Sequence, residues 1–183
     1  MNWLSSIIIL LGAFLAVYLE TSVDFFRQWF GAQIDALPAI IVYAALRDSF
    51  ESVILTALLG GLWFDSFSSN NLGVSVISLL VAGAILHHFR ALLLRGDWFA
   101  QFMLGAGASL VCPVISISLL QLLGASPLLS WGSLWQLLVM TAAGGICSPV
   151  CFTVFDRLSQ AFNYQPKPGP SFRADRQIKR GRA

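Results

Sequence analysis

The chain has 183 residues, of which 57% are hydrophobic and only 11% are charged. Soluble domains carry about 25% charged residues, so this composition excludes an ordinary water-soluble globule. The formal net charge is +2 and the mean hydropathy is +0.76. Because the apolar residues gather in long runs, the sequence predicts an all-α polytopic membrane protein, and we expect no nucleic-acid partner.

Six apolar stretches predict six membrane-spanning helices within a domain of residues 1–162. The stretches cover residues 3–19, 34–46, 52–64, 72–86, 99–123 and 134–155. The last two are long enough to cross a hydrocarbon core of about 30 Å, whereas the second and third reach only roughly 20 Å each. The first stretch lacks a preceding basic residue and continues past its small residues, so we expect a retained span rather than a cleaved signal peptide.

Three charged residues, Arg47, Asp48 and Glu51, separate the second stretch from the third. If residues 34–64 formed one continuous span, these charges would lie at mid-membrane. Each charge would then cost about 2.5–3.5 kcal/mol. We therefore expect a helical hairpin whose charged turn lies at the membrane surface. Whether both arms of this short hairpin cross the membrane fully stays open.

Lysine and arginine divide unevenly between the two sides of a six-span arrangement. Arg27 stands alone on one side. The other side holds Arg47, Arg90, Arg95, Arg157, Lys167, Arg173, Arg176, Lys179, Arg180 and Arg182. By the positive-inside rule, both termini are expected in the cytoplasm. A five-span arrangement also keeps the C-terminus inside and remains an alternative.

Two segments outside the apolar stretches have a distinct composition. Residues 20–33 mix aromatic and charged side chains, as in an interfacial helix or an ordinary aromatic belt. Residues 163–183 are rich in proline and then strongly basic, so we expect a disordered cytoplasmic tail. Its charge lies mainly on Arg173, Arg176, Lys179, Arg180 and Arg182. The tail either anchors the topology or is attracted to anionic lipid or an acidic partner.

Small residues at four-residue spacing and two internal prolines mark the apolar stretches. Gly105 and Ser109, like Gly144 and Ser148, form pairs that allow close helix packing in lipid. Pro113 and Pro149 lie inside the two longest stretches. Each proline removes one backbone donor, so we expect helix kinks, which either shape a cavity or serve packing alone.

No pattern in the sequence points to catalysis, a cofactor or a metal. Known nucleophile, zinc and phosphate-loop motifs are missing, and acidic residues occur singly near the ends of the predicted helices. His87 and His88 are adjacent, so they point about 100° apart on a helix and cannot share one metal as an i, i+4 pair does. The three cysteines lie in apolar runs and are expected to pack as small hydrophobic residues.

One constellation surrounds the predicted hairpin. Pro38 opens its first helix and Arg47 closes it, Gly61 stands four residues before Asp65, and Gly73 follows eight residues later. This order resembles the central signature of the MreD family of rod shape-determining membrane proteins. The resemblance implies a structural or partner-binding role for these five residues. We expect Asp65 to be an exposed carboxylate where the third helix meets the outer surface.

The resemblance extends over residues 3–162 and implies a six-helix bundle similar in fold to the substrate-binding subunits of energy-coupling-factor transporters. It implies a non-enzymatic scaffold in the bacterial inner membrane, in contact with membrane lipid. Such a scaffold would bind MreC, a single-span protein with a periplasmic domain. It would help to couple cytoplasmic MreB filaments to peptidoglycan synthases. The alternatives are a small-molecule-binding transporter subunit of the same fold and, third, an enzyme acting on lipid.

Overall fold

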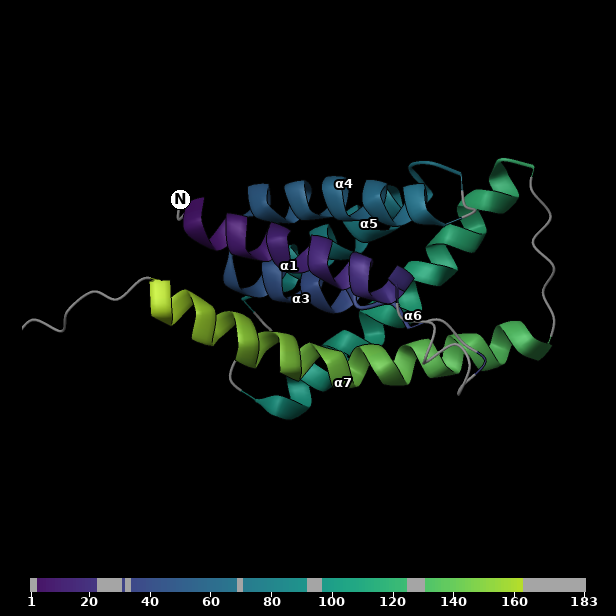
Figure 1. The fold of residues 1–183 in the computed structure, drawn as a ribbon. Helices are drawn as coiled ribbons and strands as arrows, with labels where there is room; N and C mark the ends of the chain where they lie inside the picture. Colours follow the sequence, from purple (N-terminus) through teal and green to yellow (C-terminus); the bar gives the residue numbers. More distant parts are fainter. Residues whose placement is uncertain are drawn as a thin grey trace, which may run out of the picture.

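The computed structural model describes residues 3–22, 31, 34–68, 71–91, 97–124 and 131–162, and these form six helices and no strand. Their bounds are Trp3–Ser22 (α1), Leu37–Arg47 (α3), Phe50–Phe67 (α4), Val74–Phe89 (α5), Trp98–Leu122 (α6) and Trp131–Phe162 (α7). Figure 1 shows α1, α3, α4 and α5 gathered together, with α6 crossing them and α7 running along one side. The chain is thus an all-α helical bundle.

Three of these helices are long and apolar enough to cross a membrane: Phe50–Phe67, Trp98–Leu122 and Trp131–Ala161. Many large apolar side chains point outward, as lipid contact requires, including Leu11 on α1 and Leu138 on α7, each 63% exposed. The chain is therefore a membrane protein.

Helix α3 occupies the centre of the bundle. All of its residues from Leu37 to Leu46 are buried, and it packs against each of the other five described helices. A helix that is hydrophobic all round lies either in a core or in a membrane span, and the contacts of α3 place it in the core. At about 1.5 Å per residue its 11 residues span roughly 17 Å. Because the other helices shield it, α3 does not need the length of a lipid-facing span.

The chain turns between α3 and α4 at Asp48 and Ser49. This is the helical hairpin expected from the charges at Arg47, Asp48 and Glu51. The carbonyl of Ala44 accepts the Asp48 N–H at 3.0 Å, and the carbonyl of Ser49 accepts the Ser52 N–H at 3.1 Å. The last turn of α3 and the first turn of α4 are thus both hydrogen-bonded, with only two residues between the helices.

Helices α6 and α7 form the most extensive pair in the bundle. Their closest approach is made by small residues: a Cβ added to Gly105 would meet Ser148, and one added to Gly144 would meet Ser109. The two spaced pairs noted in the sequence therefore lie against one another. In lipid, where apolar association alone gives little gain, such close backbone packing holds helices together.

Neither internal proline ends its helix, since α6 continues past Pro113 and α7 past Pro149. Kinks at these prolines stay a prediction. The predicted tail at 163–183, with its five basic positions, lies outside the described residues. So does most of the segment 20–33.

Candidate functional site

The five residues of the hairpin constellation are divided between the two ends of α3. Gly61, Asp65 and Gly73 meet where α4 is followed by α5. Pro38 lies in the first turn of α3, and its neighbour Leu37 is the side chain that a Cβ on Gly60 would approach at 3.1 Å. The start of α3 thus lies beside this part of α4. Arg47 lies at the opposite end of the helix.

Asp65 is a buried capping residue and is only 2% exposed. Its Oδ2 accepts hydrogen bonds from the N–H of Gly73 at 2.7 Å and from the N–H of Ser75 at 3.3 Å. Gly73 is the residue before α5 and has a φ of +97°, a left-handed conformation that glycine adopts without steric cost. The carboxylate therefore satisfies backbone donors at the positive end of α5. The expectation of an exposed Asp65 is wrong, because its side chain turns inward to these donors.

Gly61 lets α4 and α5 touch through their backbones. A Cβ placed on Gly61 would lie 2.8 Å from both the backbone nitrogen and the Cα of Val76. Such an atom would overlap main chain, which cannot rotate away as a side chain can. Gly61, Asp65 and Gly73 together form what we call the α4–α5 corner.

At the other end of α3, an ion pair joins α3 to α7. The Arg47 guanidinium donates to Oδ2 of Asp156 at 2.9 Å, and the Tyr43 hydroxyl donates to Oδ1 at 3.1 Å. The Tyr43 ring stacks on Phe155 and meets Phe152 edge-on, with ring centroids 5.0 and 5.1 Å apart. Both oxygens of Asp156 are therefore engaged by α3.

The turn after α3 carries a second polar group. The carboxylate of Asp48 accepts from the N–H of Ser49 at 2.9 Å and, at 3.5 Å, from the hydroxyl of Ser6. The Ser6 hydroxyl also lies 2.7 Å from that of Ser52. These bonds tie the beginning of α1 to the turn.

The end of α5 reaches the same region. His87 places Nδ1 3.1 Å from the Ala45 carbonyl, and Arg90 donates to the Asp48 carbonyl at 3.4 Å. Carbonyls at the end of a helix favour such basic partners. His87 thus contacts backbone, and the described residues contain no group of three side chains suited to a metal.

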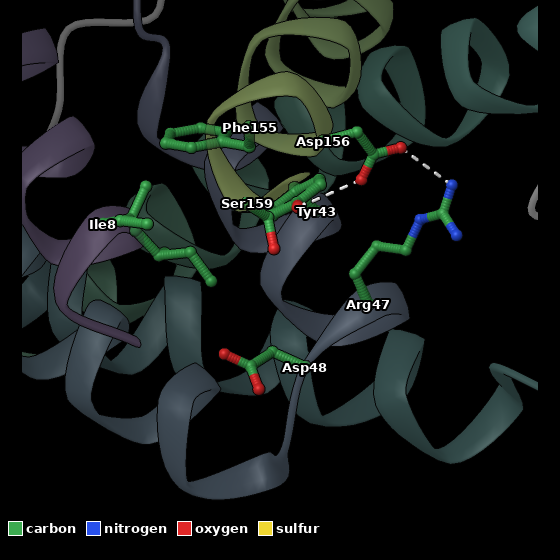
Figure 2. A pocket seen from close by; sticks show the side chains of 8 residues that line it. Ile8, Tyr43, Arg47, Asp48, Phe155, Asp156 and Ser159 are labelled. Atoms are coloured by element: carbon green, nitrogen blue, oxygen red, sulfur yellow. Dashed lines mark hydrogen bonds and ion pairs between the residues drawn. The ribbon is translucent and has the colours of Figure 1, made fainter. Parts of the chain in front are cut away.

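A cavity of about 190 Å³ opens between α1, α3 and α7 at this end (Figure 2). It has one apolar side and one polar side. Its lining consists of Ile8, Ile9, Tyr43, Arg47, Asp48, Phe155, Asp156 and Ser159. We refer to it as the α1–α3–α7 cavity. Of the five constellation residues, only Arg47 lines it.

Sequence reasoning did not single out Asp156 or the pair Glu20 and Asp35. Asp156 is the one acidic residue of α7, which is a weak signal at the end of a span. Glu20 near the end of α1 lies close enough to Asp35 for the two carboxyl groups to interact, and both Glu20 carboxyl oxygens are shielded from solvent. Each acid occurs singly in the sequence, so only the fold brings these groups together.

The described residues therefore hold polar groups at both ends of α3, with a buried helix cap at one end and an open cavity at the other. Both depend on contacts between helices that are distant in the chain. No protein-family model, curated protein or solved structure matches this chain. Its function is inferred from the residues themselves and from the way they are packed.

Proposed function

We propose that the chain is a non-enzymatic scaffold of the bacterial cell elongation complex, with a role like that of MreD. The observation that carries the proposal is the α4–α5 corner. Of the residues that the resemblance singled out, Gly61 lies there against the backbone of Val76, and Asp65 accepts a hydrogen bond from Gly73. These contacts give the three residues a structural role, in agreement with the role that the resemblance implies.

The partner in this proposal is MreC, and the site of action is the bacterial inner membrane. A single-span partner would bind through close packing with a lipid-facing helix surface, of which this bundle has several. MreC would bring a periplasmic domain, whereas the basic tail and the Arg47 end would face cytoplasmic MreB. The chain would then help to couple these filaments to peptidoglycan synthases through binding alone.

A ligand-carrying transporter subunit is less well supported. Pockets that enclose drug-sized ligands measure about 300–1,000 Å³. The α1–α3–α7 cavity, at about 190 Å³, falls below that range. Its size suits a small group, such as one headgroup or one side chain, rather than a vitamin.

Deletion of the gene in a rod-shaped host is expected to make the cells round. The physical reason is that the membrane link between the filaments and the synthases is lost. No enzyme activity is expected to disappear from the membranes. Cell width and length are measured by microscopy, with the intact gene restored from a plasmid as the control. Unchanged width and shape in every growth condition would rule out the elongation role.

Cysteine labelling is expected to place residue 2 in the cytoplasm and residue 70 in the periplasm. The prediction follows from the uneven distribution of lysine and arginine and from the charged turn at Asp48. A single cysteine replaces Asn2 or Asn70 in a chain whose three native cysteines are changed to alanine. An impermeant thiol reagent is then applied to intact cells with an opened outer membrane. Labelling at residue 2 would contradict six spans and favour five.

A further inference from the structure

The α1–α3–α7 cavity has the size of a small polar headgroup. An engineered apolar cavity of about 150 Å³ in another protein holds one benzene ring, so about 190 Å³ accommodates a group of several heavy atoms. The same volume would hold about six water molecules at ~30 Å³ each. The cavity is open on one side, so a group attached to a larger molecule can enter it.

The charges that line the cavity favour a cation. Among the lining residues, Arg47 and Asp156 neutralise one another through their ion pair, which leaves Asp48 as the one uncompensated charge of the lining. The Arg90 guanidinium bonds to the backbone carbonyl of Asp48 and is not part of the lining. The partners of the Asp48 carboxylate described above, the Ser49 N–H and the Ser6 hydroxyl, are neutral. In Figure 2 the carboxylate points into the hollow, and the hydroxyl of Ser159 faces it from α7. A primary ammonium group, with three N–H donors, matches these two acceptors.

The apolar surroundings of the cavity favour a lipid as the carrier of that cation. Ile8, Ile9 and Phe155 form its apolar side. Ile7 on α1 and Leu158 on α7, each next in the sequence to a lining residue, are 48% and 39% exposed and can face acyl chains in a membrane. Polar acceptors inside and apolar surface outside suit an amphipathic ligand better than a soluble amine.

Close packing of α1 on α7 sets the depth of the cavity. A Cβ on Gly12 would collide with the Phe155 ring, so the two helices are in contact one turn from Ile8. The Phe155 ring, which lines the cavity, is therefore held against α1 on this side.

Arg47 offers a second point of recognition. Its guanidinium uses one nitrogen for Asp156, and the side chain is 40% exposed. Arginine has five N–H donors in a planar fork that suits phosphate oxygens. The phosphate that neighbours an ethanolamine group in a phospholipid would thus lie beside Arg47 at the cavity mouth.

We propose that the α1–α3–α7 cavity binds the headgroup of an ethanolamine phospholipid. Asp48 and Ser159 accept hydrogen bonds from the ammonium group, and Arg47 contacts the phosphate. The inference concerns this cavity alone, and it holds or fails independently of a role in cell elongation.

The test compares two lipids that differ only in the ammonium group. The full chain is placed in nanodiscs of dioleoyl phosphatidylcholine containing a small fraction of dioleoyl phosphatidylethanolamine, and lipids retained after extraction are measured by native mass spectrometry. Choline carries three methyl groups in place of the N–H donors. We expect enrichment of the ethanolamine lipid over the choline lipid by at least about tenfold, the effect of one hydrogen bond to a charged group.

Matched variants assign the enrichment to the cavity. Asp48→Asn keeps an acceptor for the Ser49 N–H and removes the charge, so the enrichment should disappear. Glu51→Gln removes an exposed acid three residues away that does not line the cavity, so the enrichment should persist. Ser159→Ala should reduce it several-fold. The thermal unfolding temperature of each variant in pure choline lipid shows that it is folded.

Four results would overturn the proposal. The first is equal retention of both lipids by the parent chain. The second is an equal loss of enrichment in Asp48→Asn and Glu51→Gln. The third is enrichment that appears only after removal of residues 163–183, since a basic side chain of the tail would then be the occupant. If millimolar ethanolamine stabilises the parent chain and ethanolamine lipid does not, the ligand is a soluble amine, and the lipid assignment is wrong.

Discussion

Replacement of Gly61 by leucine is expected to push α4 away from α5 and to destabilise the bundle strongly. The Cβ alone would lie 2.8 Å from main-chain atoms of Val76 and 2.9 Å from its Cγ2, so even the first atom of the side chain does not fit. Overpacking of this kind costs about 1–3 kcal/mol and sometimes more. The thermal unfolding temperature of the purified chain in detergent should therefore fall clearly. Co-purification with MreC should fall with it if the corner supports the partner surface.

A matched control uses another glycine in the middle of a helix. Gly107 lies on α6 with nothing within 4 Å of the position that its Cβ would take. Gly107→Leu changes the same atoms on an open, exposed face and should leave the unfolding temperature unchanged or slightly raised, because leucine favours helix over glycine. Equal unfolding temperatures for the two leucine variants would show that α4 and α5 do not meet at Gly61.

Asp65→Ala is expected to cost about 2–3 kcal/mol of stability. Alanine removes the acceptor of the Gly73 and Ser75 N–H groups, and water cannot replace it freely because Asp65 is 2% exposed. The first turn of α5 should loosen. Hydrogen exchange of the Gly73 and Ser75 amides, together with the unfolding temperature, would measure that effect.

Asp65→Asn separates hydrogen bonding from charge. Asparagine keeps one side-chain oxygen and is itself a good residue at the start of a helix, so most of the stability should return. Ser66→Ala serves as a neighbouring control, since its exposed hydroxyl bonds only to its own helix at Leu62. If asparagine proves as damaging as alanine, the negative charge at the α5 end matters more than the two hydrogen bonds.

The helices themselves were largely predictable. Long apolar runs can be stable in lipid only as helices, since each backbone donor must be satisfied within its own segment. The cost of burying Arg47, Asp48 and Glu51 predicted where α3 ends and α4 begins. The central position of α3 was harder to predict from the sequence. Its uniform apolarity is compatible with a lipid-facing span, and only its contacts with five helices distinguish the two.

The sites were predictable only in part. The spacing of Gly61, Asp65 and Gly73 drew attention to the α4–α5 corner, yet the inward turn of the Asp65 side chain does not follow from spacing. The cavity was missed because it needs a contact between residues 109 positions apart, Arg47 and Asp156. A single acidic residue near a helix end, such as Asp156, does not indicate in the sequence which side chains it will bind.

The central position of α3 also bears on how the protein is made. The ribosome completes α3 early, while α5, α6 and α7, which cover much of it, are still to be synthesised. Until α7 reaches the membrane, Tyr43 and Arg47 lack Asp156, the group that both of them bind. Helix α7 is therefore the last of the five helices to pack against α3. A chain interrupted before α7 would leave a polar and unpaired α3 end for membrane proteases to recognise.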